Sequence, residues 1–212
     1  MYKKAARPLA ILLLVITVGL LHFGNVRKTD ADQPEHFEGI GAQGYLVFGD
    51  VLPLASVSTG CGEFIPDHAT ECVLSVAIYD YSVPTDYRLI FGWTFIDESR
   101  LIIDKSLASA SITDTIDGVI CHFSESPQRC IPITMGVDVQ WTATGRPITR
   151  PLGITKIEEC GPHAKGIGWE MTREAVLSGT ITINSVPFTS TGSILGLLTR
   201  DTFPHMEGPT CD

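Results

Sequence analysis

The strongest constraint on the fold is a strict two-residue alternation of side chains over residues 131–143, IPITMGVDVQWTA. Apolar residues take the odd positions, and the even positions hold mostly polar or turn-forming residues. Successive side chains of a strand point to opposite faces of a sheet. The pattern therefore predicts one long strand with Val139 and Trp141 buried and Asp138 and Gln140 in solvent.

Other segments carry related strand signals. Residues 175–183 alternate in the same way, and residues 107–118 alternate small and polar side chains before ending at a predicted turn. Residues 72–80 and 87–96 are apolar on both faces, as central strands are. Short turn-rich segments separate these stretches, and helical periodicity is absent. The chain is therefore predicted to be all-β, with an antiparallel β-sandwich or a barrel-like domain.

The predicted domain organisation has three parts. Residues 1–28 are expected to form a signal peptide or signal anchor with one hydrophobic helix. Residues 29–43 are polar and lack a periodic apolar pattern, so they are predicted to be a linker. Residues 44–212 show no further change in composition and have an ordinary size for one domain, here the β-sandwich domain.

The N-terminal part contains the apolar run Leu9–Phe23, flanked by basic residues. A helix over this run would be about 22 Å long, which is short of the roughly 30 Å hydrocarbon core and fits a signal-peptide core better than a spanning helix. However, small-x-small cleavage triplets occur only at residues 17–19 and 29–31, which are poor positions. Lack of a good cleavage site favours an anchor that contacts the membrane through residues 9–23. Cleavage remains the alternative, and a buried core helix is a third interpretation.

Charge is distributed unevenly along the chain. Residues 1–28 carry five basic and no acidic residues, and the remaining residues carry 10 basic and 24 acidic ones, a net charge of −14. A basic end before an acidic domain favours a membrane-directed N-terminus. It also argues against nucleic acid as a partner, because phosphate binding needs a basic face.

The six cysteines all follow the apolar run, and their spacing lacks the close pairs of zinc sites. An even number of cysteines behind an export signal predicts disulfides and an extracytoplasmic location, either in the cell membrane or envelope or secreted. Cys121 and Cys130 flank a predicted hairpin turn, so they are expected to pair across neighbouring strands. Proximity also favours Cys61–Cys72, and Cys160–Cys211 follows by elimination.

Motifs for chemistry are few. The sequence contains no serine-hydrolase elbow, phosphate-binding loop or zinc-protease helix, so it predicts neither catalytic residues nor a cofactor. One segment between two cysteines gathers carboxylates and an imidazole, ligand types that suit divalent cations. Its candidate metal ligands are Glu63, Asp67, His68 and Glu71, although their spacing also fits an ordinary polar loop. Residues 157–169 hold a second polar cluster, formed by Glu158, Glu159, Cys160 and His163. A thiolate metal site is one interpretation of it, and a loop tied down by a disulfide is the favoured one.

Tryptophan positions separate into two groups. Trp93 and Trp141 occupy apolar register and are predicted to pack in the core. Trp169 lies beside Gly166 and Gly168 and is the tryptophan that the sequence favours for exposure. Exposed aromatic rings are able to stack on carbohydrate.

The C-terminal third resembles uncharacterised exported bacterial β-proteins with a Trp-Thr-x-Thr-Gly strand motif followed by a strand with a Ser-Gly-Thr core. The matching positions are Trp141, Thr142, Thr144, Gly145, Ser178, Gly179 and Thr180. The resemblance implies export and a β fold, and it supplies no activity or site.

Two functional classes follow. The first is a non-catalytic surface or envelope protein with a binding or structural role, whose ligand would be a protein or a glycan. The alternative is an extracellular hydrolase acting on a polymer. Sites are not determined by fold, and no motif favours the enzyme.

Overall fold

The computed structural model describes residues 35–49, 53–65, 69–80, 87–123, 129–156 and 165–207. These residues form an almost entirely antiparallel β structure, which confirms the all-β prediction. Their one helical element is the short η1 (Glu98–Arg100), and no helix in these ranges has the length and apolar character needed to cross a membrane. The predicted N-terminal helix lies outside the described residues.

The described ranges contain eleven strands, which form one sheet. They are β1 (Glu35–Val47), β2 (Pro53–Ile65), β3 (Ala69–Asp80), β4 (Arg88–Ile96), β5 (Leu101–Ile103), β6 (Ser109–His122), β7 (Arg129–Ala143), β8 (Ile148–Lys156), β9 (Lys165–Ile183), β10 (Val186–Thr189) and β11 (Gly192–Glu207).

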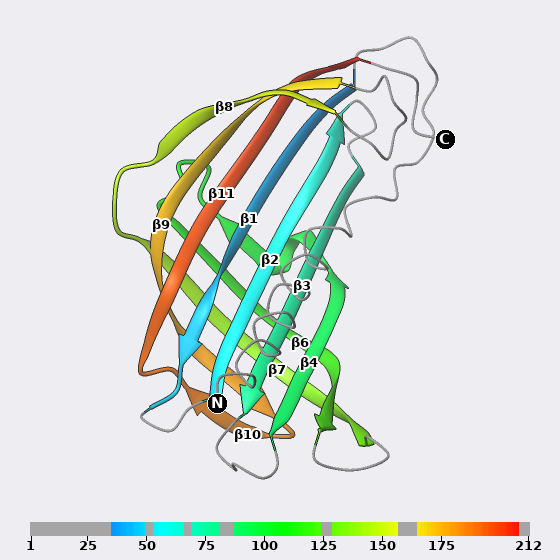
Figure 1. The fold of residues 1–212 in the computed structure, drawn as a ribbon, viewed down its shortest axis with the longest axis vertical. Coiled ribbons are helices and arrows are strands. Elements are labelled where there is room, and N and C mark those ends of the chain that lie inside the picture. Colours follow the sequence, from blue (N-terminus) through cyan, green and yellow to red (C-terminus); the bar gives the residue numbers. More distant parts are fainter. Residues whose placement is uncertain are drawn as a thin grey trace, which may run out of the picture.

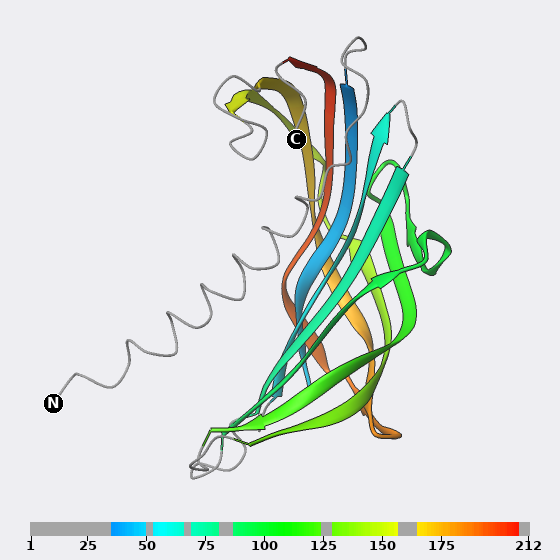
Figure 2. The same ribbon diagram turned by 90° about the vertical axis from the view of Figure 1, so that its right-hand side faces the viewer.

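Strand pairing runs in a closed circuit rather than as two facing sheets. Eight strands follow one another in the order β1, β2, β3, β4, β6, β7, β9 and β11, and β11 pairs again with β1. The circuit corresponds to the barrel-like form of the predicted fold. In Figure 1, β1, β2 and β3 run in front while β6 and β7 cross behind them, and Figure 2 shows the curvature of the same layers from the side.

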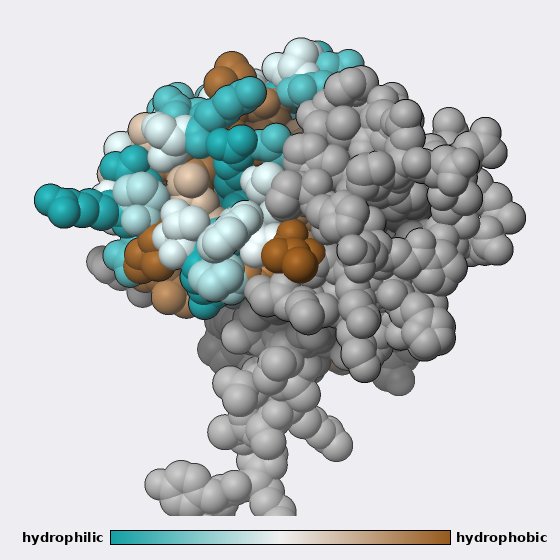
Figure 3. All heavy atoms as spheres, turned by 90° about the horizontal axis from the view of Figure 1, so that it is seen from above, coloured by the Kyte–Doolittle hydropathy of each residue, from teal (hydrophilic) through white to brown (hydrophobic). Residues whose placement is uncertain are grey.

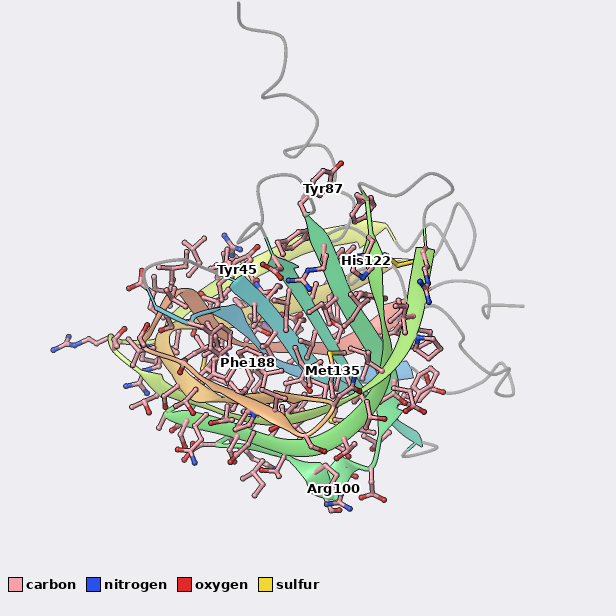
Figure 4. The ribbon with its side chains drawn as sticks, turned by 90° about the horizontal axis from the view of Figure 1, so that it is seen from below. Tyr45, Tyr87, Arg100, His122, Met135 and Phe188 are labelled. Carbon is pink, nitrogen blue, oxygen red and sulfur yellow. A yellow bond between two sulfur atoms is a disulfide. The ribbon has the colours of Figure 1, made fainter. Side chains whose placement is uncertain are left out.

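Apolar side chains fill the inside of this circuit. The largest fully buried ones come from six of the strands (β1, β3, β6, β7, β9 and β11) and from the loop before β6: Trp141, Leu46, Leu74, Leu107, Ile112, Ile116, Met135, Ile181 and Leu198. Figure 4 looks into the circuit from below, with Met135 among the enclosed side chains and Arg100 at the outside. Burial of one such side chain is worth about 1.5–3 kcal/mol, so this interior supplies the main stabilisation of the fold.

Strand β7 has the register that its alternation predicts. Val139 and Trp141 are fully buried, whereas Asp138 and Gln140 are exposed. The indole Nε1–H of Trp141 donates a hydrogen bond of 3.1 Å to the backbone carbonyl oxygen of Gln43 on β1. This bond crosses the interior and satisfies the one polar atom of the ring.

Two glycines on neighbouring strands allow the interior to close. A Cβ atom at Gly92 would lie 2.5 Å from the Cε atom of Met135, and one at Gly118 would lie 2.7 Å from the same atom. Gly118 was expected to end a strand in a turn, but β6 continues through it to His122. The missing side chain makes room for Met135 rather than for a turn.

The sheet also begins earlier than the sequence suggests. Residues 35–43, which were expected to belong to the linker, form most of β1. Strand β1 pairs with β2 on one side and with β11 on the other. Its polar start therefore lies in the middle of a sheet, where backbone pairing rather than apolar alternation holds it.

Candidate functional site

The upper end of the domain in Figure 1 includes the start of β1 and β9, strand β8 and the end of β11. We call this region the upper extension: residues 35–41 of β1, 148–156 (β8), 165–173 of β9 and 199–207 of β11. Among the side chains that the structure describes, the buried apolar ones of β1, β9 and β11 begin below it, at Ala42, Ala175 and Leu198. Figure 3 looks down on this end and shows brown apolar residues scattered among hydrophilic ones.

The face of the upper extension that continues the interior carries an ion pair. Arg200 on β11 binds Glu38 on β1, with its Nε–H donating to Oε1 at 2.6 Å. Arg200 also reaches the backbone carbonyl oxygen of Lys105, at 3.5 Å, in the loop before β6. Both side chains are about one quarter exposed, and their opposite charges leave little net charge at this position.

Trp169 lies on this same face. Thr202 on β11 pairs in register with both Trp169 on β9 and Glu38 on β1. Trp169 is 50% exposed, in agreement with the expectation from its glycine-rich surroundings, and its neighbour on the face, Ile167, is 55% exposed. Both side chains stand on a paired strand rather than on a loop, so their backbone is held in place.

The opposite face of the upper extension carries three charged side chains in a row. Arg150 on β8 forms an ion pair with Glu170 on β9, and Glu170 is the register partner of Asp201 on β11. The Oδ1 atom of Asp201 is buried without a hydrogen-bond partner among the described residues. The row places two carboxylates side by side with one guanidinium.

The environment of Asp201 changes its proton affinity. Burial disfavours the charged form, and the neighbouring negative charge of Glu170 adds to this effect, while Arg150 opposes it. Together they raise the pKa of Asp201 to about 6. Shifted carboxyl groups gather at functional sites, and they also occur in structural ion-pair networks.

A second exposed feature is an aromatic pair on β4. The rings of Trp93 and Phe95 meet edge to face with centroids 5.7 Å apart, and they are 43% and 57% exposed. The prediction that Trp93 packs in the core is wrong. Strand β4 pairs with β6 only as far as Gly92, and Trp93 points away from the interior face that Ile90 and Gly92 share.

The outer face also holds an open polar depression of about 460 Å³. It lies over β6, β7 and β9, where Gly136 forms the floor between two threonines. Its lining residues are Thr115, Thr134, Gly136, Thr182, Asn184 and Ser185. None of these side chains ionises, so the depression offers hydrogen bonds and no acid–base chemistry.

Two disulfides join neighbouring strands. Cys61 on β2 is bonded to Cys72 on β3, and Cys121 on β6 is bonded to Cys130 on β7. Both are register partners, as the hairpin reasoning required. Cys160 and Cys211 lie outside the described residues.

Candidate metal ligands are only partly described. Glu71 is exposed on β3, opposite Gly62, and Glu63 belongs to the backbone of β2. Asp67 and His68 lie outside the described residues, as do Glu158, Glu159, Cys160 and His163 of the second polar cluster. Within the described ranges, no group of three histidine, cysteine, aspartate or glutamate side chains is arranged to hold a metal ion.

Glu38, Arg150, Glu170 and Asp201 were not singled out by the sequence. Their only sequence signal is charge within β-compatible segments, which is usual for solvated strand faces. What distinguishes them is register, because pairing of β8, β9, β11 and β1 brings together residues far apart in the chain.

Comparisons with known proteins assign no family. No family model matches the chain, and no curated protein matches it. One similar solved structure is that of a "putative AttH" from Nitrosomonas europaea, with 12% identity and a TM-score of 0.43. The alignment covers 84% of this chain and 53% of the other, so the chain spans about half the length of that protein. A similarity of this size assigns neither family nor activity.

Proposed function

We propose that this chain is an exported domain, held at the outer side of a membrane by residues 9–23, that binds a protein or glycan ligand without catalysing a reaction. Export is supported by the two disulfides, since such bonds persist in oxidising compartments. The basic, apolar N-terminal segment and the acidic remainder of the chain agree with this direction of export.

The observation that carries the binding role is the exposed pair Trp93–Phe95. Large rings that remain in water on a rigid strand are typical of surfaces that recognise partners, because they bury much area with little loss of conformational entropy. Within the described ranges, β4 pairs with β6 only as far as Gly92, and both rings remain about half exposed.

Retention of the purified full chain on immobilised envelope polysaccharides and envelope proteins tests this role. The double variant Trp93→Ala/Phe95→Ala is expected to lose most of the retention. Trp169→Ala is the matched control, because it removes an equally exposed ring at another place. Equal retention of the two variants would contradict the assignment to the β4 pair.

A polymer hydrolase is the second candidate, and the pair Glu170–Asp201 favours it. Glycoside hydrolases use two carboxyl groups, one of them an acid with a raised pKa, and Asp201 beside Glu170 offers such a pair. Incubation of the chain with labelled envelope polysaccharides tests this candidate. If the chain releases labelled product at pH 5–6 and the Asp201→Asn variant does not, the chain is a hydrolase. If the substrate stays intact with the unchanged chain, the hydrolase candidate is wrong and the binding role stands.

A further inference from the structure

The upper extension is the end of the domain to which the N-terminal segment is attached. Strand β1 starts at Glu35, whose register partner is Met206 on β11, and Met206 pairs in turn with Gly166 on β9. Trp169 follows three residues later on β9. Usual strand spacing and rise then place Trp169 about 15 Å from the start of β1.

The length of the intervening chain limits how far this end can lie from a bilayer. Residues 24–34 separate the apolar run from β1, and eleven residues span at most about 40 Å. The far end of β1 lies about 40 Å further away, because the strand has 13 residues. When residues 9–23 are in the membrane, the start of β1 is therefore held within about 40 Å of the bilayer surface, and the far end of β1 is held less closely.

This end carries apolar side chains that remain in water. Ile167 and Trp169 are both about half exposed on one face of β9. Near Trp169, Glu38 on β1 and Arg200 on β11 form an ion pair, so their opposite charges cancel. Tryptophan has a preference for the boundary between headgroups and acyl chains, where its ring is apolar and its N–H is wet.

We propose that Ile167 and Trp169 contact the lipid surface and orient the tethered domain with its upper extension on the bilayer. The inference rests on the proposed membrane attachment. In this orientation the pair Trp93–Phe95 on β4 remains available for a ligand. The apolar segment alone limits only the distance between the domain and the bilayer, whereas the contact through Ile167 and Trp169 sets the orientation of the domain.

Quenching of tryptophan fluorescence by brominated lipid acyl chains tests the contact. The full chain is reconstituted into phosphatidylcholine vesicles with or without brominated chains, as two variants. Trp93→Phe retains Trp141 and Trp169, and Trp169→Phe retains Trp93 and Trp141. The buried Trp141 is a constant background in both.

The expected result is a clear loss of emission in brominated vesicles for Trp93→Phe and unchanged emission for Trp169→Phe. Flotation of the vesicles separates the possible failures. A chain that floats with the vesicles but shows no loss in Trp93→Phe, or equal loss in both variants, would overturn the lipid contact alone. A full-length chain that does not float would overturn the contact together with the membrane attachment.

Discussion

Trp141 is expected to be the most costly aromatic residue to remove, because it joins β7 to β1 through the middle of the interior. The ring is fully buried, and its Nε1–H is bonded to Gln43 at 3.1 Å. Truncation of a buried tryptophan to alanine costs about 3–5 kcal/mol through lost burial and the cavity that remains. Loss of the hydrogen bond, which is partly buried, adds about 1 kcal/mol.

Urea unfolding followed by circular dichroism measures this effect. With a denaturant slope of about 2 kcal/mol per molar, Trp141→Ala should lower the midpoint by about 2 M. Trp141→Phe keeps an apolar ring and loses the donor, so it should cost about 2 kcal/mol. Trp93→Ala is the control, because its ring is 43% exposed, and it should cost no more than about 1 kcal/mol. Equal midpoints for Trp141→Ala and Trp93→Ala would refute the described interior.

Three further outcomes are expected. Val139→Asp should unfold the domain, because it places an unpaired charge in an apolar interior. Gln140→Lys, on the exposed face, should leave the thermal unfolding midpoint nearly unchanged. Similar midpoints for the two variants would show that the register of β7 is wrong. Replacing Cys61 and Cys72 by serine should lower the free energy of unfolding in urea by roughly 3 kcal/mol, because the disulfide closes a short loop and so lowers the entropy of the unfolded chain. An unchanged urea midpoint would contradict this stabilisation. Asp201→Asn should stabilise the protein at pH 7.5 by about 1 kcal/mol after allowance for solvent screening, and this gain should fade towards pH 4. The reason is that the pKa of Asp201 is raised on folding, so the free energy of unfolding of the unchanged protein falls as the pH rises from about 4 to 6. A gain that grew as the pH fell would contradict the burial of this carboxyl group.

The part of the fold that the sequence predicts well is the part where one face is packed and the other is in water. Residues 133–141 show this directly, because burial on one face leaves an alternation that can be read from the sequence. The two described disulfides can be predicted in a similar way, because each joins cysteines that lie opposite one another on strands that are consecutive in the chain: Cys61 with Cys72 and Cys121 with Cys130.

The upper extension could not be predicted in this way, because both of its faces are partly exposed. Glu38 and Gly39 resemble a linker, yet pairing with strands on both sides places them within the sheet. Trp93 lies in an apolar stretch, and its exposure depends on where β4 separates from β6. Such outcomes are set by contacts between distant segments, for which local periodicity carries no signal.

The central claim is that the chain is exported and disulfide-bonded. Its most direct test begins with intact native cells, whose thiols are trapped by a rapid alkylating agent, and continues with peptide mapping of the chain without reduction. The account predicts peptides that link Cys61 to Cys72 and Cys121 to Cys130, with no alkylated form of these four cysteines. Alkylation at all four positions would show that the chain resides in a reducing compartment and would contradict export.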